Sequence, residues 1–227
     1  MSGESRWGRK SVNCNGKQLA FYRKACGLTQ SELATREGYS ERLVRKAESG
    51  ASVMGVVLRD LAAALSSPDS PISPEDLSSD PEQMAKILLH AFKQHEAEWV
   101  SQIRHLLSSQ VTVRCAGDPA KIPFAGEWNG IDDVDRWVRI FFATMHHREK
   151  DYYNPRFITQ GNMVVAWGED WYRVRGVEFP PLWVSQRFVF ERGQLVLLEN
   201  LFDTDGGSAQ LAEARARGML NEEGEQA

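Results

Sequence analysis

Cysteine is scarce in this sequence of 227 residues and follows no pattern. The three cysteines, Cys14, Cys26 and Cys115, are odd in number and lack C-x-x-C spacing. This argues against a disulfide framework and against a zinc site, and it fits the reducing cytoplasm. We expect neither a metal nor a cofactor.

Long apolar runs are missing as well. No stretch of the sequence approaches the roughly 18 apolar residues that a membrane-spanning helix needs. The first residues lack the apolar core of a signal peptide. No internal repeat is visible. We therefore expect a cytoplasmic protein that makes no use of a membrane.

Positive charge is in deficit over the whole chain, whose net charge is -4. Its distribution is uneven. Residues 1–66 carry 11 basic and 6 acidic residues, a net charge of +5, whereas the rest carries 16 and 25, a net charge of -9. A basic front on an acidic body is expected where one domain meets phosphates and the other does not.

The basic segment reads as helices behind a short tail. Residues 1–14 are polar, and we expect them to form a disordered tail. Apolar residues from Gly16 to Cys26 recur at about 3.6-residue spacing, which predicts a helix that Gly27 ends. A later helical stretch covers Val53 to Leu65.

Between these stretches lie two short helices and a sharp turn. Thr29 and Glu32 form a capping box that starts the first helix. Gly38 supplies the left-handed backbone of the turn, and Ser40 is a good N-cap for the second helix, Glu41–Glu48.

This pattern resembles the helix-turn-helix of Cro and the phage repressors, the xenobiotic-response-element type of bacterial regulator. The resemblance rests on Arg23, Leu28-Thr29-Gln30, Glu32-Leu33-Ala34, Gly38-Tyr39-Ser40, Val44, Glu48, Gly50 and Leu61-Ala62-Ala63-Ala64-Leu65. It implies a bundle of five helices whose third helix enters the major groove.

The resemblance also implies roles for single residues. Arg23 would pair with Glu48 as a structural brace. Gln30 would contact phosphate. The residues expected to read or approach bases are Ser40, Glu41, Arg42 and Lys46, with Arg45 either joining them or lying on a solvated face. A generic helical bundle used for protein contacts is the alternative.

A linker is expected next. Residues 66–81 hold four prolines and six serines, which cannot form a continuous helix. We place the first domain at residues 15–66, the linker at 67–81, a second domain at 82–206 and a polar C-terminal tail at 207–227.

The second domain shows helices first and strands afterwards. Helical spacing runs from Met84 to Leu107, with a break near Glu96, and returns from Asp132 to Met145. A strand is expected at 110–115, followed by an irregular loop up to 130. Four further strands are expected at 156–160, 163–174, 182–190 and 194–204. This order predicts an α+β fold.

This part resembles the NTF2-like superfamily, in particular its polyketide-cyclase and ketosteroid-isomerase-related group. The residues concerned are Gly117-Asp118-Pro119, Pro123-Phe124-Ala125-Gly126, Gly130, Phe141-Phe142 and Asp203-Thr204. The resemblance implies a curved antiparallel sheet around helices, a cone with an apolar pocket. The expected pocket residues are Asp118, Trp128, Phe141, Gln186, Phe188, Leu198, Asn200 and Phe202.

The last hairpin predicts which residues share a face. Glu191-Arg192-Gly193 fits a three-residue loop with Gly193 in a bulge. The inward face would then hold Val184, Gln186, Phe188, Val196, Leu198, Asn200 and Phe202. The outward face would hold Trp183, Val189, Leu195, Leu197 and Leu201. That outer face is too apolar for open water, so we expect it to form a dimer interface.

Catalysis in the pocket is the weaker interpretation. Asp118 loosely matches the proton-abstracting carboxylate of the isomerases and Gln186 matches their second acid, but the expected tyrosine has no counterpart near Ala91. Asp118-Pro119 could equally be a turn. His146 and His147 could cap the carbonyls of the preceding helix.

We therefore expect a transcriptional regulator that binds double-stranded DNA at a palindromic operator. Its NTF2-like domain would dimerise and bind a small apolar effector. The alternatives are an isomerase, cyclase or hydrolase with a DNA-binding head, and an interaction module whose cone is filled by its own Trp and Phe side chains.

Overall fold

The computed structural model describes residues 8, 10–147 and 153–220. The chain divides into two compact units. The first comprises Met1–Ile87 with Glu191–Gln194, and the second comprises Leu88–Phe190 with Leu195–Ala227. None of the helices in the described ranges is long and apolar enough to cross a membrane.

The first unit is mainly helical. Its core lies between the helices α1 (Gly16–Ala25), α2 (Gln30–Arg36), α3 (Glu41–Glu48) and α4 (Gly55–Leu65). Strand β1 (Ser11–Asn13) pairs antiparallel with β2 (Ser52–Met54), so the last helix begins later than expected. Up to Leu65, the described residues of this unit form four helices and a small sheet, where the resemblance implied five helices.

The expected tail and linker are both part of this unit. Strand β1 and the buried Cys14, 2% exposed, occupy residues predicted to be disordered; residues 1–7 and 9 lie outside the described range. In the predicted linker, Ile72 and Leu77 belong to the hydrophobic core, and the carbonyl of Leu77 accepts from the amide of Asn15 at 2.8 Å. Proline prevents a helix here but does not prevent packing.

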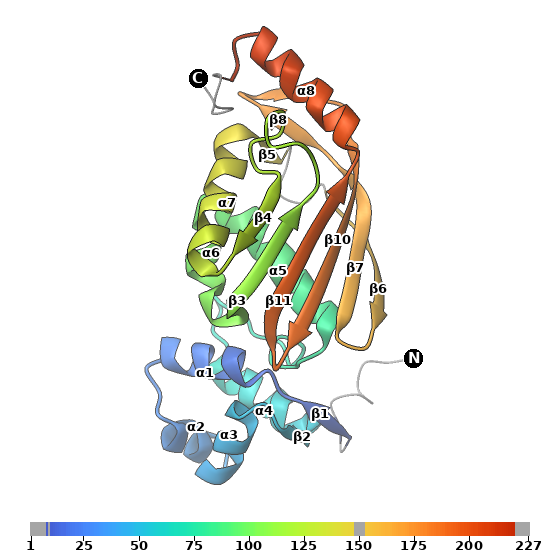
Figure 1. The fold of residues 1–227 in the computed structure, drawn as a ribbon. Helices are drawn as coiled ribbons and strands as arrows, with labels where there is room; N and C mark the ends of the chain where they lie inside the picture. The colour runs from blue at the N-terminus through green and yellow to red at the C-terminus, as the bar shows by residue number, and fades with distance from the viewer. Residues whose placement is uncertain (1–7, 9, 148–152, 221–227) are drawn as a thin grey trace. The chain divides into compact units, whose positions relative to one another are not determined.

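The second unit is built on a six-stranded sheet in the order β4-β3-β11-β10-β7-β6 (Figure 1). Strand β3 pairs with β11 in parallel, while β3–β4, β10–β7 and β6–β7 are antiparallel. The bounds are β3 Leu107–Cys115, β4 Gly126–Asn129, β6 Arg156–Gln160, β7 Met163–Asp170, β10 Leu182–Glu191 and β11 Gln194–Phe202.

Helices and a small second sheet complete this unit. Helix α5 (Pro81–His95), which belongs to this unit from Leu88 onward, is separated from α6 (Trp99–Ile103) by a break at Glu96, as predicted, where φ is 48°. Helix α7 (Ile131–Thr144) buries Trp137 and Phe141. The small sheet contains β5 (His146–His147), β8 (Tyr172–Val174) and β9 (Val177–Glu178). The α+β class of this unit is as expected.

Several predicted elements differ from the structure. The strand expected over 163–174 is interrupted at Trp171, and β4 lies in the expected loop. Helix α8 (Thr204–Ala216) covers residues 207–216 of the expected polar tail and buries Leu211 and Ala214; residues 221–227 lie outside the described range. Asp203 is the N-cap of this helix, and its carboxylate accepts from the amide of Gly206 at 3.0 Å. The sequence of α8 is mostly polar and few of its residues are buried, so its apolar pattern did not predict a helix.

The last hairpin also differs from its prediction. Arg192 and Gly193 both have positive φ values, 51° and 74°, so they form a two-residue turn of the primed type instead of a three-residue loop. The register between β11 and β3 shifts between Leu195, which pairs with Leu107, and Leu197, which pairs with Thr112. Leu195, expected on the outer face, is fully buried.

Candidate functional site

The turn between α2 and α3 is fixed by short-range contacts. Gly38 takes φ of 69°, and the amide of Tyr39 returns to the carbonyl of Ala34 at 2.8 Å. The hydroxyl of Ser40 accepts from the amide of Leu43 at 3.3 Å. Ser40 is thus the N-cap of α3, and its hydroxyl is already engaged by the protein backbone.

Helix α3 has one buried and one exposed side. Val44 and Ala47 are fully buried, whereas Arg42, Arg45 and Lys46 are exposed. Arg45 forms an ion pair with Glu41. The sequence predicted that Glu41 approaches bases, but in the structure its carboxylate is paired with Arg45. Arg42 and Lys46 have no ion pair with any described residue, which leaves them as the available cations of this helix.

A buried ion pair holds α3 against α1. Arg23 Nε lies 2.5 Å from Glu48 Oε1, and the two side chains are only 10% and 9% exposed. Arg23 also donates to the carbonyl of Leu28 at 2.6 Å. The amide of Gln30 donates to Glu48 Oε2 at 2.7 Å. Gln30, expected to contact phosphate, therefore belongs to this brace, which we define as Arg23, Gln30 and Glu48.

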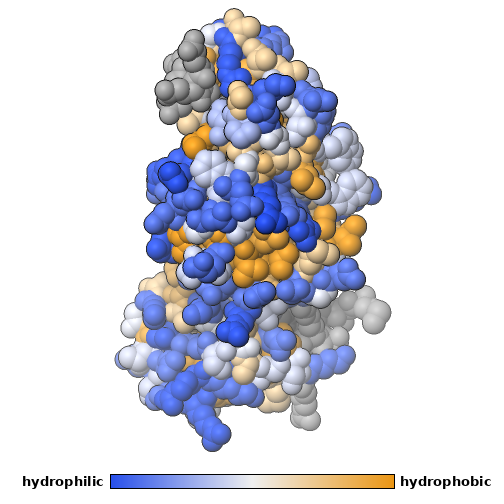
Figure 2. All heavy atoms as spheres, in the orientation of Figure 1, coloured by the Kyte–Doolittle hydropathy of each residue, from blue (hydrophilic) through white to orange (hydrophobic). Residues whose placement is uncertain are grey.

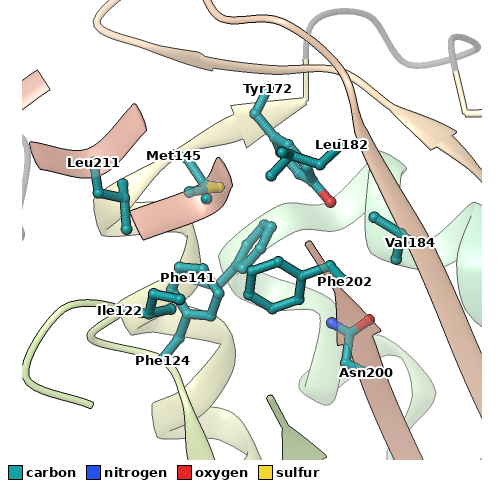
Figure 3. A pocket seen from close by; sticks show the side chains of 11 residues that line it. Ile122, Phe124, Phe141, Met145, Tyr172, Leu182, Val184, Asn200, Phe202 and Leu211 are labelled. Carbon is teal, nitrogen blue, oxygen red and sulfur yellow. The ribbon is translucent and has the colours of Figure 1, made fainter. Parts of the chain in front are cut away.

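The second unit contains a small apolar cavity of about 20 Å³ (Figure 3). A space of that size holds about one water molecule. The end of α7 contributes Met145 to the lining, and α8 contributes Gly207 and Leu211. The full lining is Ile122, Phe124, Phe141, Met145, Tyr172, Leu182, Val184, Asn200, Phe202, Gly207 and Leu211.

Three of the expected pocket residues line this cavity: Phe141, Asn200 and Phe202. Phe188 and Leu198 are buried in the core instead, at 1% and 4% exposure. Figure 3 shows the lining side chains converging from the sheet, from α7 and from α8.

The remaining three make other contacts. Asp118 is exposed, and its carboxylate accepts from the amide of Ala120 at 3.0 Å, which is the turn that the sequence offered as an alternative. Trp128 is half-buried and donates to the carbonyl of Phe124 at 3.3 Å. Gln186 accepts from the hydroxyl of Tyr153 at 3.1 Å.

A buried polar cluster adjoins the cavity, and sequence analysis missed it. Asp170 is 2% exposed and accepts the hydroxyl of Tyr172 at 3.0 Å and the amide of Trp171 at 2.9 Å. Nε2 of His147 lies 3.2 Å from the same carboxylate. His147, expected to cap a helix, instead pairs in β5 with Tyr172 of β8. The sequence signal that could have indicated this cluster is Asp170, an acidic residue at the end of the apolar strand β7.

Burial raises the pKa of Tyr172, in this cluster, and the pKa of Cys115. Burial, and then the neighbouring carboxylate of Asp170, raise the pKa of Tyr172 well above its ordinary value, so the phenol stays protonated. Burial raises the pKa of the Cys115 thiol to about 12. Among the described residues, no three His, Cys, Asp or Glu side chains gather closely enough to hold a metal ion.

The other face of the sheet exposes large apolar side chains. Ile158 is 62% exposed, Trp183 55% and Leu201 54%. The rings of Trp167 and Trp183 stack with centroids 5.5 Å apart. Figure 2 shows apolar atoms reaching the surface among polar ones over the strands.

Comparison with known proteins finds no family model and no curated protein that matches this chain. Solved structures of similar fold do match. An NTF2-like protein of unknown function from Burkholderia pseudomallei is 22% identical, with a TM-score of 0.47, over 60% of this chain and 97% of its own. An NTF2-like protein from Burkholderia xenovorans is 15% identical, with a TM-score of 0.46, over 57% of this chain and 93% of its own.

A candidate SnoaL-like polyketide cyclase from Shewanella putrefaciens is 13% identical, with a TM-score of 0.44, over 59% of this chain and 86% of its own. Likenesses at this level assign neither a family nor a reaction to the chain. None of these three proteins is named as a DNA-binding protein.

Proposed function

We propose that this chain is a sequence-specific DNA-binding transcriptional regulator. The observation that supports this proposal is that α3 has one side anchored in the protein and one side exposed. One side of that helix is anchored by Val44, Ala47 and the brace, and the other presents Arg42 and Lys46 without ionic partners. A short helix held this way, following a tight turn, suits insertion into the major groove.

The chemistry of the exposed residues favours base reading by Arg42. Its guanidinium can form two hydrogen bonds to guanine, a contact that discriminates by about 1–3 kcal/mol against the wrong base. Lys46 suits either a base or a phosphate. Glu41 would have to leave Arg45 before it could accept from cytosine.

The proposal is tested by selecting bound sequences from random duplex DNA with the purified full-length protein. We expect a palindromic preference, because two copies reading half-sites multiply a modest specificity. Arg42→Ala should relax the preference at one position in each half-site. Arg59→Ala is the matched control, since it removes the same charge from an exposed site on α4. An unchanged preference in Arg42→Ala would refute the groove assignment.

We further propose that the second unit is an NTF2-like domain that dimerises through its outer sheet face. The exposed Ile158, Trp183 and Leu201 support this, since exposed apolar groups gathered on one surface mark interaction sites. Leu201→Lys should shift the protein towards monomer in analytical ultracentrifugation. Met54→Lys, which changes an exposed apolar residue of the first unit, should not.

As part of the same proposal, the cavity of the second unit binds a small apolar effector. A ligand that binds the dimer more tightly in one state would change operator affinity, and DNA would change ligand affinity by the same factor. The enzymatic alternative is less well supported, because its carboxylate, Asp118, is exposed and already bonded in a turn. A cytoplasmic location stays a prediction.

A further inference from the structure

The cavity of the second unit is lined by a buried hydrogen-bond acceptor that has no donor within the part of the chain that the structure describes. Asn200 is 8% exposed, and its Oδ1 has no hydrogen-bond partner among the described residues. A buried acceptor without a donor is costly, so the site favours an occupant that supplies one. Figure 3 shows the Asn200 amide beside Phe202 and the hydroxyl of Tyr172 farther along the same cavity.

Tyr172 adds a second acceptor. Its single hydroxyl proton is donated to Asp170 at 3.0 Å, and that carboxylate is also held by the amide of Trp171 and approached by His147. The proton is therefore committed, and the phenol oxygen has only lone pairs to offer a ligand.

The charge of the site limits what can enter. None of the eleven lining residues is a lysine or an arginine, and the hydroxyl of Tyr172 is bonded to the Asp170 carboxylate at 3.0 Å. An anion entering this cavity would lose its hydration without gaining a cation. A hydroxyl can donate to Oδ1 of Asn200, whereas a hydrocarbon leaves that acceptor unpaired.

We propose that the cavity binds a neutral apolar molecule bearing a hydroxyl group, and that Asn200 is the residue that recognises the hydroxyl. The space has room for about one water molecule. A ring-sized ligand must displace part of the lining. Helix α8 is the element that covers the cavity through Gly207 and Leu211, and the hydrogen bond from Gln210 to the carbonyl of Pro180, at 2.8 Å, helps to hold it.

The test uses phenol, toluene and benzoate as probes. Phenol and toluene have nearly the same shape and differ in a hydroxyl against a methyl group, and benzoate places a charged carboxylate on the same ring. Binding to the full-length protein is measured by calorimetry and by NMR. Leu211→Ala enlarges the cavity and should tighten phenol binding relative to the parent protein. In that variant we expect phenol to bind about tenfold more tightly than toluene, the worth of one hydrogen bond, and benzoate to bind more weakly than either.

Asn200→Leu, added to Leu211→Ala, should bring phenol and toluene to within about twofold of one another. Gln186→Leu is the matched control, because it removes an amide whose oxygen bonds Tyr153 and which does not line the cavity. That control should keep the tenfold preference. If Leu211→Ala does not fold, Met145→Ala provides the enlarged cavity.

A preference for toluene or benzoate, or a preference for phenol that survives Asn200→Leu, would overturn the inference. So would the failure of all three probes to bind either enlarged variant. The inference rests on the effector role proposed above. DNA selection is performed without any probe, so a failure there and a failure here are distinguishable.

Discussion

The brace of the first unit predicts a large and local loss of stability. Glu48 accepts from Arg23 through two nitrogens, at 2.5 and 3.1 Å, and from Gln30 at 2.7 Å. Glu48→Ala would leave the Arg23 guanidinium, in a side chain only 10% exposed, without its counterion. Removing one partner of a buried ion pair costs about 3–5 kcal/mol.

Gln30→Ala should cost less. It removes one hydrogen bond to a charged acceptor and leaves the ion pair intact, so we expect a loss of roughly 1.5–3 kcal/mol. Because both changes remove the hydrogen bond between Gln30 and Glu48, the variant that combines Gln30→Ala with Glu48→Ala should lose less stability than the sum of the two single losses. Replacing both charges, as Arg23→Met with Glu48→Leu, should recover much of the stability, since no buried charge is then left unpaired.

Amide hydrogen exchange measured by mass spectrometry is the suitable assay, because it separates α1 and α3 from the second unit. For Glu48→Ala we expect protection in α1 and α3 to fall by roughly two to three orders of magnitude, at about 1.4 kcal/mol per tenfold. Peptides from β7 and β10 should be unchanged. A fall of less than about tenfold would show that the pair is solvated, and the reasoning would be wrong.

Two further predictions concern packing and pH. Gly16→Ala would place a Cβ 2.1 Å from the carbonyl oxygen of Glu48 and should cost about 3 kcal/mol or more in chemical denaturation, whereas a small loss would mean that α1 can shift away from α3. Burial lowers the pKa of His105 to about 4, below its usual value near 6.5, so the neutral form is the one that the fold favours. Its contribution is complete above pH 6.5 and is lost as the pH falls from 6.5 towards 4. After allowance for partial exposure, the loss is about 1–2 kcal/mol. His105→Gln should flatten this part of the pH–stability curve, and an equally steep curve would contradict the assignment.

Local signals in the sequence were enough for the helices of the first unit. The capping box at Thr29 and Glu32 forms both of its hydrogen bonds, and Ser40 caps α3. Gly38 turns the chain with positive φ. Each signal acts within one turn of the backbone, so it can be interpreted without knowledge of the fold. The partnership of Arg23 and Glu48 came from the resemblance, and the structure contains it.

Contacts between distant segments were decided only by the tertiary structure. Nothing near Gln30 in the sequence shows that its amide meets Glu48, and nothing near Asp170 shows that β5 brings His147 to it. The register of β11 against β3 shifts between Leu195 and Leu197, and Leu195, expected on the outer face, is buried; a shift of this kind depends on the partner strand.

The cavity shows the same division. The sequence supplied its apolar character and the residues Phe141, Asn200 and Phe202. It did not supply the contribution of α8, whose polar sequence resembles a tail, or the size of the space that remains. Both depend on how side chains from separate elements fill one volume, and that filling exists only once the chain has folded.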